Sequence, residues 1–264
     1  MISKLLLNGI LTGILAGVVS FGVLHVFVGP QMERAIAFEQ QKEANETPFM
    51  AHEEHTSNGH SHHSADGAHV HSEVISRETQ AGVGALVATT VFGGAVGGLF
   101  SLVFCFLHGR VGCISPGMLS FYISVGALLA FVILPALKYP ATPPGVGLSG
   151  TIGERTGYYF VLLAGSLLLQ AAALVWYQKL KKDVTGSARF IAIGGYAVLT
   201  IIMLGMLPSF NEVPSAFSGE VLLSFRVASV ATQTTLWVVL GLTYGRYAHH
   251  ALSSQSRLLL SVNG

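Results

Sequence analysis

The sequence predicts an all-α integral membrane protein with about six transmembrane helices and one long, largely disordered histidine-rich outer loop. Of its 264 residues, 51% are hydrophobic and only 10% are charged, whereas a soluble domain carries about 25% charged residues. The charges gather in short stretches, separated by runs of about 20 residues that can cross a hydrocarbon core of roughly 30 Å as helices. This composition excludes a soluble globular domain. The net charge of +1 gives no indication of a nucleic-acid partner.

Six apolar runs are expected to be helices, because a segment in lipid must satisfy its own backbone polar groups. The first covers residues 5–28 and is expected to stop at Gly29-Pro30. It exceeds the apolar region of a signal peptide, and no A-x-A-like cleavage site follows, so we interpret it as an uncleaved helix. The other runs, which complete a single polytopic domain over residues 1–264, cover residues 81–107, 119–137, 157–177, 190–207 and 225–247.

The segment between the first two runs, residues 31–80, is the one sizeable stretch predicted outside the membrane. It is polar and acidic, with too few aliphatic and aromatic side chains to form its own core. Good helix formers from Met32 to Asn45 predict a short helix that continues to about Glu46. Little fixed structure is expected from Thr47 to Ser72.

Basic residues are divided unequally between the two sides that six alternating spans create. The side with both termini holds eight Lys and Arg residues and the other holds five, with Arg226 just inside the sixth helix. By the positive-inside rule both termini are predicted to be cytoplasmic and the long loop to face outward. The two groups are Lys4, Arg110, Lys179, Lys181, Lys182, Arg189, Arg246 and Arg257, against Arg34, Lys42, Arg77, Lys138 and Arg155.

Histidines are concentrated in the outer loop, where seven of the eleven fall within 20 residues, interleaved with carboxylates. Neutral imidazole binds zinc, copper, nickel, iron and cobalt, and carboxylates can fill remaining positions. A solvated polar tract is the alternative interpretation, but such density is more typical of metal binding. The predicted ligands are His52, Glu53, His55, His60, His62, His63, His69 and His71.

Spacing within this tract limits what it can do. Irregular spacing in a flexible loop favours capture of a metal without selection among metals. The run from His52 to His55 places its histidines at i and i+3, whereas the metallopeptidase motif needs i and i+4. That class of enzyme is therefore not indicated.

His25 and Glu33 are the candidate metal ligands nearest the membrane surface. His25 is an ionisable group near the outer end of the first helix, which indicates function, although an interfacial histidine bonded to a neighbouring helix is an equal alternative. Gln170 and Gln233 could line a pathway or hold helices together. Cys105, with His108 and Cys113, is a weaker candidate for an exit site.

Small residues and prolines give two further expectations. Gly9, Gly13 and Gly17 form successive G-x-x-x-G steps, as do Gly93 and Gly97, and such faces let helices approach closely. The partner of each face stays open. The proline-rich stretch 135–147 is expected to be a rigid outer loop that serves as a gate, a partner surface or a stiff connector. Arg226 is expected to pair with Glu220 or Glu154.

The chain resembles the CbtA family of probable cobalt transporter subunits. The resemblance rests on PALKYPATPPGVG followed by TIGERT, and on the ending FRVASVATQTTLWVVLGLTYG. It implies cobalt uptake, often linked to cobalamin synthesis, and a small single-helix partner of the CbtB type. No permanently bound cofactor is expected; the captured divalent ion would be cobalt, with nickel and zinc as alternatives.

Together, these features favour a non-enzymatic metal importer in the lipid bilayer of a bacterial-type inner membrane. A metal-sensing or metal-buffering membrane protein that transports nothing is one alternative. A membrane enzyme is the other, but it would need buried ionisable groups, and no Asp, Glu or Lys lies well inside a predicted span.

Overall fold

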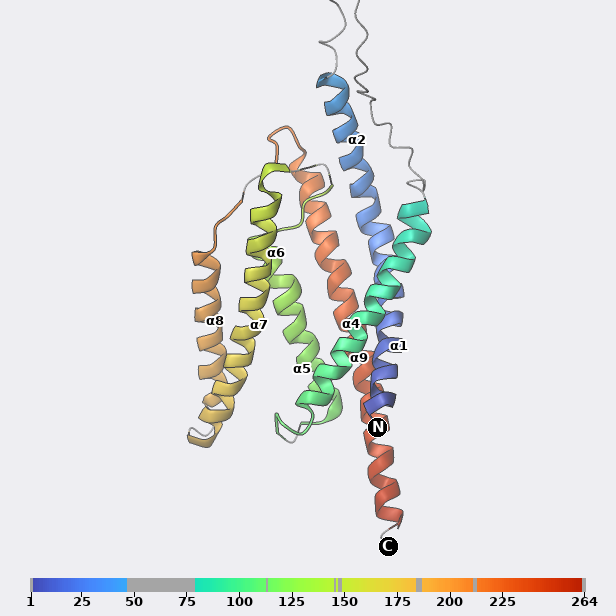
Figure 1. The fold of residues 1–264 in the computed structure, drawn as a ribbon, viewed down its shortest axis with the longest axis vertical. Coiled ribbons are helices and arrows are strands. Elements are labelled where there is room, and N and C mark those ends of the chain that lie inside the picture. Colours follow the sequence, from blue (N-terminus) through green and yellow to red (C-terminus); the bar gives the residue numbers. More distant parts are fainter. Residues whose placement is uncertain are drawn as a thin grey trace, which may run out of the picture.

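The computed structural model describes residues 2–46, 79–112, 114–144, 146, 149–183, 187–210 and 213–262. Every regular element in that part of the chain is helical, and six helices are long and apolar enough to cross a membrane. The predicted fold class and number of spans are thereby confirmed. Successive spans run in alternate directions, so that both termini lie at one end of the bundle and α2 projects from the other (Figure 1). We call these the terminal end and the α2 end.

The helices extend further than the apolar runs at most of their ends, because polar residues continue several of them. Three spans contain a short π-helical segment, labelled η1, η2 or η3. In chain order the elements are α1 (Ile2–Val23), η1 (Leu24–Val28), α2 (Gly29–Glu46), η2 (Gln80–Gly84), α4 (Ala85–Leu107), α5 (Pro116–Leu128), η3 (Leu129–Ile133), α6 (Leu134–Lys138), the 3₁₀ turn η4 (Ser149–Thr151), α7 (Ile152–Asp183), α8 (Ala188–Met206) and α9 (Gly219–Val262).

The first helix does not stop at Gly29-Pro30, so that expectation was wrong. α1, η1 and α2 form one continuous helix, and the predicted extension to Glu46 is present. Within η1 the backbone widens, and the Gly29 N–H bonds to the carbonyl of Leu24, five residues back. The hydrogen bonds of this turn already follow the π-helical pattern. The missing N–H of Pro30 therefore breaks no regular series of α-helical hydrogen bonds.

α1 packs against α4 through the two glycine faces, which settles the partner that the sequence left open. A Cβ placed on Gly13 would meet the carbonyl oxygen of Gly93 and lie 2.8 Å from the Cα of Gly97. A Cβ on Gly9 would lie 2.5 Å from the carbonyl oxygen of Gly97. Backbone meets backbone here, which only glycine allows.

α9 lies against both α1 and α5 and is joined to them by serine hydroxyls. Ser20 of α1 donates to the carbonyl of Thr232 at 3.1 Å, and Ser120 of α5 donates to that of Gly241 at 2.7 Å. Ser124 donates to the carbonyl of Trp237. Phe104 of α4 and the α9 residues Leu240 and Tyr244 are fully buried in the cluster that these helices enclose. This four-helix group is the core of the protein.

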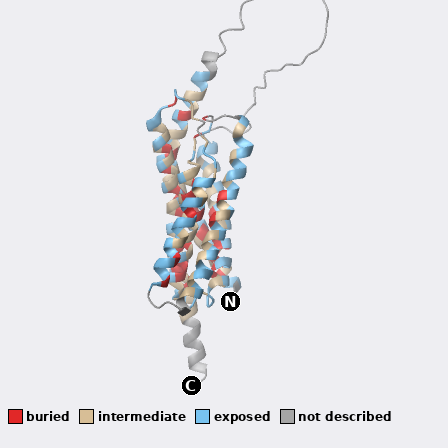
Figure 2. Cartoon of the chain, turned by 90° about the vertical axis from the view of Figure 1, so that its left-hand side faces the viewer, coloured by how far each residue is buried: buried red, intermediate tan, exposed pale blue. Residues whose placement is uncertain are grey.

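α7 and α8 form a hairpin at the side of this core, where Trp176 packs over Gly195. Most of their surface is apolar and exposed, as at Leu168 (71%) and Ile201 (68%). Buried residues gather along the middle of the bundle and exposed ones face outward (Figure 2). Exposed apolar side chains around a bundle are typical of contact with lipid.

Candidate functional site

His25 lies in the π-helical segment η1, and its side chain is exposed on the bundle surface. Its ring stacks on that of Phe21, one turn earlier, with the ring centroids 5.5 Å apart. Single π-helical turns inside α-helices occur frequently at functional positions, because they displace side chains from the regular register. The imidazole is therefore available to a ligand at the α2 end of the membrane-spanning part.

Glu33 lies on α2, where its carboxylate is exposed. Eight residues of continuous helix separate it from His25, a rise of about 12 Å. A metal ion lies about 2.0–2.2 Å from each of its protein ligands. The rise between His25 and Glu33 is much larger, so the two side chains are successive binding positions along one helix. Within the described residues, no group of three or more His, Cys, Asp or Glu side chains is placed to hold a metal ion.

The tract from His52 to His71, including Glu53, lies outside the described residues. Its attachments are described: α2 ends at Glu46 and the next helix begins at Thr79. At the terminal end, Cys105 is half-buried and His108 stacks on Phe104 with ring centroids 5.5 Å apart. Cys113 lies outside the described part, so the structure does not show the suggested exit site.

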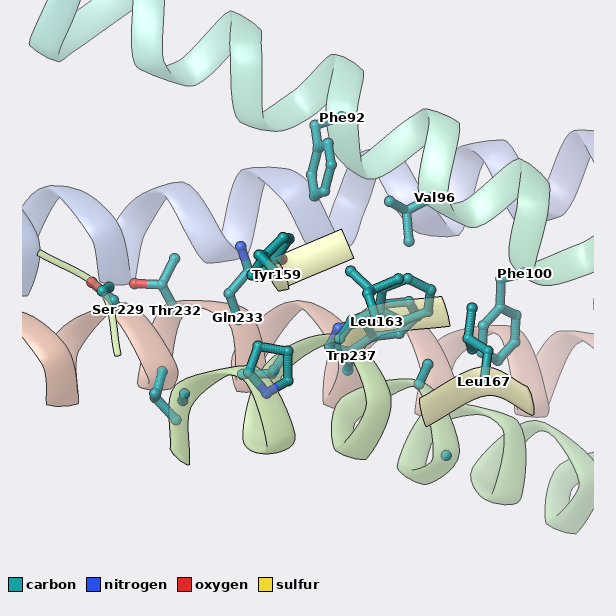
Figure 3. A pocket seen from close by; sticks show the side chains of 18 of the residues that line it. Phe92, Val96, Phe100, Tyr159, Leu163, Leu167, Ser229, Thr232, Gln233 and Trp237 are labelled. Carbon is teal, nitrogen blue, oxygen red and sulfur yellow. The ribbon is translucent and has the colours of Figure 1, made fainter. Parts of the chain in front are cut away.

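A cavity of about 1570 Å³ lies between α4, α7, α9 and the α5–η3–α6 segment. Its walls are mostly apolar, and Phe92 and Val96 of α4 face α9 across it (Figure 3). The polar groups in its lining include two amides, four hydroxyls and one guanidinium. These belong to Gln170, Gln233, Tyr139, Tyr159, Ser229, Thr232 and Arg226.

The two glutamines differ in their contacts. Gln170 of α7 donates to the Gly126 carbonyl at 2.8 Å and lies 3.5 Å from the Tyr196 hydroxyl, so it joins α7 to α5 and α8. Gln233 of α9 is exposed and lines the cavity (Figure 3). Both line the cavity, and among the contacts of the described residues only those of Gln170 join one helix to another.

A smaller pocket of about 370 Å³ opens at the α2 end of this cavity. Arg226 lies between the two spaces, and its Nε donates to the Ala141 carbonyl at 3.2 Å rather than to Glu220 or Glu154. Tyr139 donates to the Pro208 carbonyl at 3.0 Å, and burial, followed by the nearby Tyr158, raises the pKa of the Tyr139 phenol. This proline-rich stretch was expected to be a gate, a partner surface or a stiff connector, and nothing in its local sequence indicated the cavity behind it.

Comparison with known proteins gives one family. A family model described as "Probable cobalt transporter subunit (CbtA)" matches residues 2–249. No curated protein and no solved structure matches the chain. The match covers the first five apolar helices in full and the sixth as far as residue 249. The chain therefore belongs to the CbtA family of probable cobalt transporter subunits.

Proposed function

We propose that this chain imports a divalent transition-metal ion, cobalt first and nickel or zinc as alternatives, across a bacterial-type inner membrane. The histidine tract collects the ion outside, and Glu33 and His25 receive it in turn. Family membership supports cobalt transport. The ligand chemistry of imidazole supports a borderline transition metal and not a hard ion such as magnesium.

The observation that carries this proposal is that the helix bearing His25 and Glu33 continues without a break to Glu46, after which the chain enters the histidine-containing segment. Residues 47–78 connect Glu46 of α2 to Thr79, at the start of the second span. Both attachment points belong to the α2 end of the bundle, and tethering of this kind raises the effective concentration of a ligand set. An ion released from the tract meets Glu33 first and His25 about 12 Å further down the same helix.

A second polypeptide completes the pathway in this proposal. The family description calls its members subunits, and His25 alone cannot fill the coordination sphere of a metal. We assign the remaining ligands to the tract and to a small single-helix partner of the CbtB type. Uptake would then require both chains, which co-expression and omission of the partner test directly.

The orientation is part of the proposal. Both termini lie at the end of the bundle that holds most of the Lys and Arg residues, which the positive-inside rule assigns to the cytoplasm. A Ser64→Cys variant should react with a membrane-impermeant thiol reagent in intact cells. Protection of that cysteine until the cells are lysed would reverse the topology.

Uptake of radioactive cobalt into cells at limiting cobalt tests the function. Replacement of all seven tract histidines by Gln should lower uptake, and His25→Ala should lower it by at least about tenfold, as expected for loss of a metal-supporting group. His249→Ala is the matched control, because His249 is an exposed histidine at the terminal end of α9. The part of cobalt uptake that depends on the tract histidines should disappear below pH ~6.5, where imidazole is protonated.

Two results would contradict the proposal. Unchanged uptake after replacement of the tract histidines would remove the capture step. Cobalt binding by the full chain without uptake, even with the partner present, would instead favour a metal-buffering protein.

A further inference from the structure

The central cavity is a groove between two helices that do not pack on each other. We propose that this groove receives one apolar transmembrane helix of a second polypeptide, which carries a hydrogen-bonding side chain at the depth of Gln233. The inference rests on the proposed function, because it gives the second polypeptide of the transporter its place in the bundle.

The walls of the groove are α4 and α7, whose lining residues form two stripes of equal length. On α4 the lining runs from Phe92 to Leu107, and on α7 it runs from Tyr159 to Leu174. Each stripe rises about 22 Å along its helix. Rows of side chains on two helices form the kind of groove into which a third helix packs.

The groove is closed at its floor and open between its walls. At the floor α9 lies against α5, and Ser120 bonds to the Gly241 carbonyl. α4 packs on α1, whereas α7 packs on α8, and the described residues of α4 and α7 share no extended contact. Leu99 of one wall and Phe160 of the other are 64% and 62% exposed. A helix can therefore enter from the lipid, between α4 and α7.

A helix also has the right size for this space. With its side chains it is about 10–12 Å wide, so 22 Å of it occupies roughly 1,700–2,500 Å³. The cavity volume is about 1570 Å³. The groove therefore holds the larger part of such a helix and leaves one side of it facing lipid.

The groove reaches the segment of α1 and α2 that carries His25. Its lining includes Leu24 and Val28 of η1, which flank His25 in the sequence. A helix in the groove would end beside this segment. The second polypeptide would then stand where the proposed function needs further metal ligands.

Gln233 of α9 is the polar group that favours a helix over a lipid as the occupant. Its side chain is exposed on the cavity lining (Figure 3) and has no hydrogen bond to any described residue. By contrast, the hydroxyls of Ser229 and Thr232 bond to carbonyls one turn back in α9. An unpaired amide is costly in hydrocarbon, and Gln side chains join transmembrane helices by hydrogen bonds across them.

The depth of Gln233 places its amide within the hydrocarbon region. Arg226 and Arg246 of α9 are 20 residues apart, which matches the roughly 30 Å of the hydrocarbon core. Gln233 lies about 10 Å from Arg226 along the helix. An acyl chain offers no hydrogen-bonding group there, whereas a helix with Ser, Thr, Asn, Gln or His at this depth does. The family description of its members as subunits agrees with a second chain.

Photo-crosslinking tests the inference in membranes that contain the full chain and the single-helix partner of the proposed function. Photoreactive p-benzoylphenylalanine replaces Phe92 or Phe160, which line opposite walls of the groove. In the matched controls it replaces Phe106 or Phe121, which are similarly exposed and lie outside the lining. Both lining positions should crosslink to the partner helix at least about tenfold more than the controls, as expected for preferential occupancy of one site.

A second measurement tests the amide. Gln233→Leu should weaken partner binding about threefold to twentyfold, because one interhelical hydrogen bond is lost. Energy transfer between labelled chains in vesicles measures this affinity. Thr235→Val is the matched control, because Thr235 lies outside the lining and its hydroxyl bonds to the Ala231 carbonyl within α9. Elution as a monodisperse species establishes that each variant folds.

Four results would overturn the inference. Equal crosslinking at lining and control positions would show that the partner does not dock in the groove. Adducts of the lining positions with lipid alone would assign the space to acyl chains, and adducts with a second copy of this chain would assign it to self-association. Unchanged affinity of the Gln233→Leu variant would remove the amide contact.

None of these measurements uses cobalt uptake, so the inference and the proposed function can fail separately. A partner that crosslinks in the groove of a chain that takes up no cobalt would contradict the proposed function alone. Cobalt uptake by a chain whose partner crosslinks elsewhere would contradict this inference alone.

Discussion

Substitution of Gly13 by Ala should destabilise the protein, because this glycine lies where the backbones of α1 and α4 touch. The added Cβ would lie 2.8 Å from the Cα of Gly97 and against the carbonyl oxygen of Gly93. Carbon atoms pack best at about 3.5–4.0 Å, so α1 and α4 would have to separate by about 0.7–1.2 Å. Neither neighbouring atom belongs to a side chain that could rotate away.

A separation of that size between α1 and α4 loses a quarter to a half of the dispersion energy of each atomic contact in their interface. Overpacking of a close contact typically costs about 1–3 kcal/mol, and we expect Gly13→Ala to lower the free energy of unfolding by that amount. SDS titration of the purified protein in micelles, followed by tryptophan fluorescence, measures it, because Trp237 lies in the buried core.

Gly22→Ala is the matched control on the same helix. A Cβ at Gly22 would have nothing within 4 Å, and alanine is the better helix former, so this variant should be neutral or slightly more stable. If Gly13→Ala and Gly22→Ala unfold at the same SDS concentration, the backbone contact between α1 and α4 does not exist as described.

Three further predictions concern the other contacts of the bundle. Ser120→Ala removes an interhelical hydrogen bond to α9 and should lower the free energy of unfolding in SDS by about 0.6 kcal/mol. Ser229→Ala should lower it by less, because the Ser229 hydroxyl bonds within its own helix. The reverse order would contradict the assignment of the interhelical bond. Gln170→Leu should cost about 0.6–1.7 kcal/mol in the same assay, because its amide joins α7 to α5, and no loss would show that this bond is not formed. Spin labels at Val19 and Gln40 should give a distance near 30 Å by pulsed EPR, since 21 residues of unbroken helix rise about 1.5 Å each; a clearly shorter distance would indicate a bend at the proline.

The six spans could be predicted because the bilayer imposes a local requirement, about 20 residues without charge, that can be counted along the chain. The glycine faces on residues 9–17 and 93–97 were also visible, since their spacing is local. Their pairing was not, because which helices meet depends on the whole bundle. Continuation of the first helix through Pro30 was mispredicted because a π-helical turn has no simple sequence signature.

The candidate sites likewise differ in how far they could be predicted from the sequence. His25 and Glu33 could be selected from residue type and depth alone, and the structure shows both exposed on one helix. The apolar cavity and the smaller pocket beside it could not be predicted, because their lining comes from α4, α7, α9 and residues 139–142, far apart in sequence. Single lining residues were noticed: Gln170 and Gln233 as possible pathway residues, and Arg226 as the expected partner of a carboxylate.

The projection of α2 has a consequence for the proposed capture of metal. Its 18 residues rise about 27 Å beyond Val28, so Glu46, where α2 ends, stands well beyond the bundle (Figure 1). Anionic headgroups enrich divalent cations near a membrane, but this enrichment decays over a Debye length of about 8 Å at physiological salt. Glu46 therefore stands beyond the layer that lipid charge controls. We predict that the proposed capture step follows the free metal concentration of the surroundings and is insensitive to the lipid composition of the membrane.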